Sequence, residues 1–194
     1  MNRAIIGLLL VFYLAMPVLI LVDVIDFEYK FVVMVVFALV SYVLLRINGV
    51  KNKQLGITSD GWWDSIKIVL PITIIFIALA LVFYSLGWSR FEPTETLEFY
   101  IFYVFISSPV QEFLYRGMTT YFGKTFNLPI WLTVIIAASL YSFVHIIYKD
   151  YVLVASTFML GLIWHYLYLK TKNLAGVALS HAAVGLLTIF LGLI

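Results

Sequence analysis

Hydrophobic residues occur along this chain in long runs, and not as the narrow apolar stripe that a helix shows when one side faces water. Short segments that carry charges, glycine or proline separate the runs. A helix needs about 20 apolar residues to cross the hydrocarbon core of a bilayer. The pattern predicts membrane-spanning helices over seven stretches: residues 4–22, 31–46, 66–87, 97–115, 129–148, 151–169 and 174–194.

The composition agrees with a membrane protein. Of the 194 residues, 64% are hydrophobic and 11% are charged, and the mean hydropathy is +1.07. A soluble domain of this length is about half apolar. The short connections leave no room for a separate soluble domain, so we expect one all-α, polytopic membrane helix bundle over residues 1–194. The first run is about 19 residues, too long for a usual signal peptide, and is interpreted as an uncleaved span.

The lysines and arginines beside the spans predict the orientation, because cytoplasmic loops carry more of them. With the N-terminus in the cytoplasm and seven spans, the C-terminus lies outside. Nine basic residues then fall on the cytoplasmic side and three outside. The cytoplasmic set is Arg3, Arg46, Lys51, Lys53, Lys67, Arg116, Lys124, Lys170 and Lys172; the outer set is Lys30, Arg90 and Lys149. We expect a multi-pass protein of the cell (inner) membrane.

Charge and cysteine content narrow the possible partners. The net charge is +2 with no large basic cluster, so a nucleic-acid partner is not expected. The chain has no cysteine and therefore no disulfide or thiolate site. The lipid bilayer is the partner that the composition predicts.

A few ionisable side chains lie inside the predicted spans, where such groups are rare and usually functional. They are Glu112, Arg116, His145, His165 and His181, with the amide of Gln111 beside Glu112. Glu112 and Arg116 are four residues apart, a spacing that favours an ion pair on one helix. The pair either braces the helices or holds a carboxylate for acid–base chemistry.

The three histidines differ in their surroundings. His145 follows Tyr141 by four residues, so both side chains share one helix face. His181 is flanked by small residues, which let helices approach closely. His165 lies among aromatic residues near the end of its span, and we expect it at the membrane interface.

One carboxylate and two imidazoles on three spans suit either metal ligation or activation of water by a glutamate and a histidine. Without clear carboxylate partners for the imidazoles, water activation is favoured, and we expect no metal and no cofactor. Because a polar group facing lipid is costly, we expect Glu112, His145 and His181 to face one internal polar cavity from three helices. The depths of the histidines are a difficulty for this prediction. Counted from the cytoplasmic start of each span, His145 lies about 24 Å deep and His181 about 12 Å deep.

These residues resemble the signature of the CPBP family of intramembrane endopeptidases (CAAX protease and bacteriocin-processing, also called Abi). The family carries Glu-Glu-x-x-x-Arg, Phe-x-x-x-His and His-x-x-x-Asn on successive membrane helices. "QEFLYRG" is similar to the first motif through Glu112 and Arg116, "YSFVH" to the second through His145, and "HAAVG" to the third through His181. The resemblance covers about residues 50–190 and implies a core at 49–194 preceded by two spans at 1–48.

Two positions depart from the signature. Gln111 stands where the family has its first glutamate, usually assigned as the base that activates water, and Gly185 stands where an asparagine would stabilise the oxyanion. An amide accepts no proton at neutral pH. Gln111 has the shape of a glutamate without its charge. It is either the native residue or a substitution that inactivates the site.

The resemblance implies an intramembrane glutamic-type endopeptidase that cleaves a membrane-associated protein or peptide. In this hypothesis Glu112, positioned by Arg116 and helped by His145, activates water, His181 donates to the oxyanion and Gln111 holds water or substrate. One alternative is a catalytically silent membrane scaffold or regulator, favoured by Gln111 and Gly185. Another is a small transporter, against which stands the lack of an internal repeat.

Overall fold

The computed structural model describes residues 3–194, with the side chains from residue 4 onward, and within this range it is helical with no strand. Seven long helical segments follow one another, which confirms the predicted all-α bundle. The helices are α1 (Arg3–Leu21), α2 (Lys30–Ile47), α3 (Trp62–Ser85), α4 (Leu97–Phe102), α5 (Ser108–Glu112), α6 (Thr119–Thr125), α7 (Ile130–Phe143), α8 (Tyr151–Thr171) and α9 (Leu174–Phe190). Shorter or differently wound segments are η1 (Phe27–Tyr29), η2 (Asn52–Leu55), η3 (Tyr103–Ser107), η4 (Phe113–Met118) and η5 (Val144–Tyr148).

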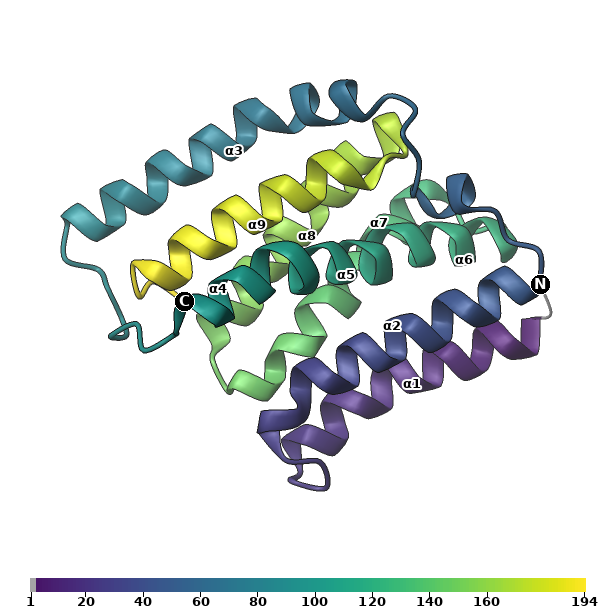
Figure 1. Ribbon diagram of the computed structural model, residues 1–194, viewed down its shortest axis with the longest axis horizontal. Helices are drawn as coiled ribbons and strands as arrows, with labels where there is room; N and C mark the ends of the chain where they lie inside the picture. The colour runs from purple at the N-terminus through teal and green to yellow at the C-terminus, as the bar shows by residue number, and fades with distance from the viewer. Residues whose placement is uncertain (1–2) are drawn as a thin grey trace.

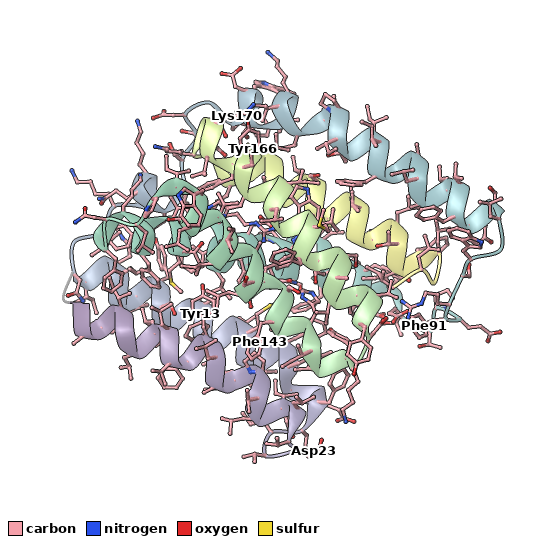
Figure 2. The ribbon with its side chains drawn as sticks, turned by 180° about the vertical axis from the view of Figure 1, so that it is seen from behind. Tyr13, Asp23, Phe91, Phe143, Tyr166 and Lys170 are labelled. Carbon is pink, nitrogen blue, oxygen red and sulfur yellow. The ribbon has the colours of Figure 1, made fainter. Side chains whose placement is uncertain are left out.

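The helices form a bundle in which sequence neighbours are not always spatial neighbours (Figure 1). α3 and α9 run side by side, and α9 packs against α5. α7 packs along α8, while the α1–α2 hairpin lies on another side of the bundle and contacts η5 and α5. Figure 2 shows Asp23 at the tip of this hairpin, Lys170 at one end of α8 and Phe91 near its other end.

Within residues 3–194, five helices are long and apolar enough to cross a membrane: residues 4–21, 27–47, 62–85, 130–148 and 151–171. The last helix, α9, is apolar but has only 17 residues. The predicted span at 97–115 differs most, because the helix continues through α6 to Thr125. Arg116 therefore lies within the helix and is buried, and the prediction that it is a flanking cytoplasmic charge was wrong.

Polar and apolar residues are distributed as expected for a protein whose solvent is lipid. Many large apolar side chains on the helix surfaces are exposed, among them Val11, Val32, Leu39, Ile74 and Phe105. The interior holds hydroxyl, amide and charged groups, among them Ser41, Ser108, Gln111, Glu112, Arg116, Thr120, His165 and His181. A charged group facing hydrocarbon would be costly, so burial inside the bundle is its favourable position.

The central helix from α4 to α6 is continuous but contains two π-helical segments, η3 and η4, on either side of α5. Pro109, in the first turn of α5, has no N–H to donate, and its ring would crowd the carbonyl of residue 105 in a regular α-helix. The wider π turn at η3 accommodates it. π segments occur frequently at functional sites, and α5 carries Gln111 and Glu112.

Candidate functional site

Glu112 lies at the end of α5 and is enclosed by two basic side chains. Its Oε1 lies 2.7 Å from Nδ1 of His181 on α9, and its Oε2 lies 3.1 Å from Nε of Arg116. All three side chains are at most 3% exposed. A carboxylate accepts hydrogen bonds, so Nδ1 of His181 carries the proton. The two partners offset the cost of burying the carboxylate among apolar helices.

Arg116 is held by aromatic rings as well as by Glu112. Its guanidinium lies 4.3 Å from the centre of the Tyr141 ring and 5.6 Å from that of Trp164. A cation over an aromatic face is attracted by the negative charge of the ring face. Nη1 and Nη2 are buried with no hydrogen-bond partner among the described residues. The guanidinium is therefore oriented by its Nε contact and by ring stacking.

His181 is fixed on both ring nitrogens and on one ring face. In the neutral imidazole with a proton on Nδ1, Nε2 accepts, and the Tyr141 hydroxyl donates to it at 3.2 Å. The indole of Trp164 stacks on the imidazole with ring centres 4.9 Å apart. Trp164 is anchored in turn by its Nε1, which donates to Ser180 Oγ at 3.0 Å. In this tautomer His181 has no N–H left for a further acceptor.

His145 lies in η5, where α7 tightens into a 3₁₀ turn, and its side chain is partly exposed. Its Nδ1 lies 2.7 Å from the carbonyl oxygen of Tyr141. A carbonyl only accepts, so Nδ1 carries the proton and Nε2 of the neutral ring keeps a free lone pair. No hydrogen bond among the described residues joins His145 to Glu112. His145 instead packs on the Tyr141 ring and interacts electrostatically with His181 and Arg116.

The structure thus brings Glu112, Arg116 and His181 into direct contact and places His145 one side chain away, across Tyr141. The difference in depth expected from the sequence does not keep the two histidines apart. The Tyr141 ring packs against both imidazoles, with its centre 5.0 Å from that of His145 and 5.6 Å from that of His181. The start of α9 is fixed by its buried N-cap, Asn173, which donates to the carbonyls of Thr58 and Asp60 in the loop before α3.

Gln111 is buried next to Glu112 in the sequence. Its Nε2 donates to Ser107 Oγ at 3.0 Å, one turn earlier in the same helix. This hydrogen bond orients the amide.

His165 does not lie at the interface. It is fully buried, and its Nε2 lies 3.2 Å from Thr120 Oγ1 between α8 and α6. The prediction failed because aromatic residues occur in packed cores as well as at membrane interfaces. Trp164, the preceding residue, packs against His181 and Arg116 in the candidate site, and no motif indicated it.

Among residues 3–194, no group of three or more aspartate, glutamate or histidine side chains could hold a metal ion. The acidic and imidazole groups that meet here are two, Glu112 and His181.

An apolar groove of about 460 Å³ lies beside the site. It is formed by α2, the loop after η2, the α5–η4 segment and the start of α9. Pro109, three residues before Glu112, and Ala178, three residues before His181, line it. The groove therefore runs along the same two helices that carry Glu112 and His181.

The chain matches the model of a known protein family. The family model described as Type II CAAX prenyl endopeptidase Rce1-like matches residues 93–187, from just before α4 to within α9. This range contains Gln111, Glu112, Arg116, His145 and His181. No curated protein and no solved structure matches the chain significantly.

Proposed function

Because the chain belongs to the CPBP family through its Rce1-like CAAX prenyl endopeptidase domain, we propose that it is an intramembrane endopeptidase whose site is formed by Gln111, Glu112, Arg116, His145 and His181. The family is one of membrane proteases, and the chain is a multi-pass membrane protein. The observation that supports the proposal best is the buried Glu112–His181 contact of 2.7 Å, one aromatic ring away from a histidine with a free lone pair.

In the proposed reaction His145 accepts the proton of the attacking water at Nε2. The hydroxyl adds to the carbonyl carbon of the substrate, the C–N bond breaks, and the proton passes from His145 to the departing amine. Glu112 is the base expected from the sequence, but its Oε1 accepts from His181, its Oε2 is ion-paired with Arg116, and the side chain is fully buried. We assign to it the positioning of His181, and to Arg116 the positioning of Glu112.

Gln111 takes a polar role without proton transfer. Its amide is held by Ser107 and can hydrogen-bond to water or to a substrate carbonyl, but it accepts no proton at neutral pH. With the glutamine at this position, the proton acceptor has to come from another side chain, and His145 offers one.

The apolar groove between α2, α5 and α9 is proposed as the place where the membrane-associated part of the substrate binds. Its lining is mostly aliphatic and aromatic, with Tyr42 and Phe113 among its residues. Apolar clefts of this volume are typical of ligand sites. Three substrate classes fit this description: a prenylated C-terminus, a leader peptide and a C-terminal sorting signal.

The proposal is tested with the purified protein in liposomes and one quenched fluorogenic peptide of each class. Cleavage of at least one peptide is expected, with a loss of about a hundredfold or more in His145→Ala and in Glu112→Ala. Lys67→Ala is the matched control, because this lysine is 74% exposed and is none of the assigned residues. Equal cleavage by all variants would exclude the assigned residues.

A silent membrane scaffold or regulator is the second candidate, favoured by Gln111 and Gly185 at positions where the resembled signature has glutamate and asparagine. A scaffold would cleave none of the peptides, and it would still capture a membrane protein partner when its Glu112 is replaced by alanine. Cleavage that depends on His145 excludes this candidate.

A further inference from the structure

The hydroxyl of Tyr103 lies directly against Gly185. A Cβ built on Gly185 would overlap this hydroxyl and would lie 2.7 Å from the ring carbon Cζ of Tyr103. Tyr103 comes from η3, the π segment before α5, and Gly185 from α9. The glycine therefore makes room for a tyrosine hydroxyl that arrives from a different helix.

The position of this hydroxyl is at the candidate site. Gly185 follows His181 by four residues, so both lie on one face of α9. The Tyr103 ring meets the His181 ring edge to face, with centres 6.0 Å apart. Its side chain is 8% exposed, so the hydroxyl is largely shielded from lipid.

Hydrolysis of a peptide bond develops negative charge on the carbonyl oxygen, which a preorganised donor stabilises. His181 was the expected donor, but its Nδ1–H is engaged by Glu112 and its Nε2 by the Tyr141 hydroxyl. A neutral tyrosine hydroxyl beside His181 supplies an O–H without adding charge to the bundle.

We propose that Tyr103 is a further catalytic residue, whose hydroxyl donates a hydrogen bond to the oxyanion formed from the substrate carbonyl. This inference rests on the proposed endopeptidase function. It also explains Gly185: an asparagine there would collide with Tyr103, so the residues at 103 and 185 are alternatives for one space.

The first test is Tyr103→Phe, which keeps the ring and removes the hydroxyl. With the peptide that the wild-type protein cleaves in liposomes, kcat is expected to fall about a hundredfold at unchanged KM. The melting temperature is expected to stay that of the wild type. Tyr100→Phe, one turn earlier in α4 and packed on Phe190, is the matched control and should keep full activity.

The second test exchanges the two side chains. Gly185→Asn alone should be destabilised and inactive, and Tyr103→Ala alone inactive. The double variant Tyr103→Ala/Gly185→Asn should regain kcat about tenfold above Tyr103→Ala, because the amide now supplies the donor. A purely structural role for Tyr103 predicts recovery of the melting temperature but not of kcat.

The outcomes separate the two proposals. A Tyr103→Phe protein whose kcat stays within about threefold of the wild type, while His145→Ala is inactive, overturns this inference alone. A wild-type protein that cleaves none of the peptides overturns the proposed function and this inference with it.

Discussion

At the scale of single residues, the buried ion pair is the feature on which the site depends. Arg116 and Glu112 are both at most 1% exposed and contact each other at 3.1 Å. A buried pair contributes little compared with apolar residues of the same size, but removal of one partner strands the other charge. Replacing either residue alone should therefore destabilise the fold, whereas replacing both together should be tolerated.

We expect Arg116→Ala to lower the free energy of unfolding by about 3 kcal/mol and to abolish activity, because it leaves a buried carboxylate without its cation. Thermal unfolding in detergent measures the first effect. The double variant Glu112→Gln/Arg116→Met, which removes both charges, should recover most of the stability and none of the activity. A single variant that melts like the wild type would show that Arg116 is not buried against Glu112.

At the scale of the helices, close approach is made possible by small residues. A Cβ on Gly176 of α9 would overlap the carbonyl oxygen of Ser65 in α3. At the same place the Gly176 N–H donates to Ser65 Oγ at 3.0 Å. Further along the two helices, Thr73 Oγ1 of α3 lies 2.7 Å from Ser180 Oγ of α9. α9 needs this approach because His181 has to reach Glu112.

Gly176→Ala is therefore expected to destabilise the protein by about 1–3 kcal/mol through overpacking against the backbone of α3. Gly7→Ala is the matched control, since nothing lies within 4 Å of a Cβ there. That variant should leave stability unchanged or raise it by up to about 1 kcal/mol through helix propensity. Equal melting temperatures for the two variants would contradict the close α3–α9 contact.

At the scale of the whole molecule, an ion pair connects the loop after α3 to the start of α8. Both guanidinium Nη atoms of Arg90 lie 2.9 Å from the carboxylate of Asp150. Asp150 also caps α8, accepting from the N–H groups of Val152 and Leu153. The same loop is tied to the end of the chain, because the Arg90 and Phe91 N–H groups donate to the Gly192 carbonyl.

The hydrogen bonds from Arg90 hold the pKa of the Asp150 carboxyl below its ordinary value of 3.8. A lowered carboxyl pKa stabilises the fold above the unfolded-state value and loses this effect as the pH falls through the folded-state value. The melting temperature should therefore decrease below about pH 4. Asp150→Asn keeps a capping oxygen but should melt lower at pH 7 and lose less on acidification. An identical pH profile in both proteins would contradict the role of this pair.

The orientation in the membrane is a further prediction for the whole molecule. Without the buried Arg116, eight basic residues remain on the predicted cytoplasmic side and three outside. The chain has no cysteine, so a thiol reagent labels only a cysteine that is introduced, and the labelling reports on which side of the membrane that position lies. In intact cells a membrane-impermeant maleimide should label Thr94→Cys and reach Lys53→Cys only after permeabilisation. Both positions are exposed, and the reverse labelling would invert the predicted orientation.

The sequence by itself determined that the chain is an all-α bundle, and it named most of the polar residues of the candidate site. Runs of apolar residues and an i,i+4 charge pair are local patterns, so spans such as 151–169 and the pair Glu112–Arg116 can be recognised without knowledge of neighbours. The ordered motifs also carried the family assignment. One boundary failed, at 115, because the apolar run ends there while the helix continues into a polar, buried part.

Tertiary structure alone decided how these residues meet. The Glu112–His181 contact joins positions 69 residues apart and depends on the packing of α9 against α5. The π turns around α5, the burial of His165 and the Tyr103 hydroxyl over Gly185 likewise follow from packing between helices. A sequence pattern shows which face of a helix is polar, but the partner of that face depends on how neighbouring helices shift and rotate to fill the interior.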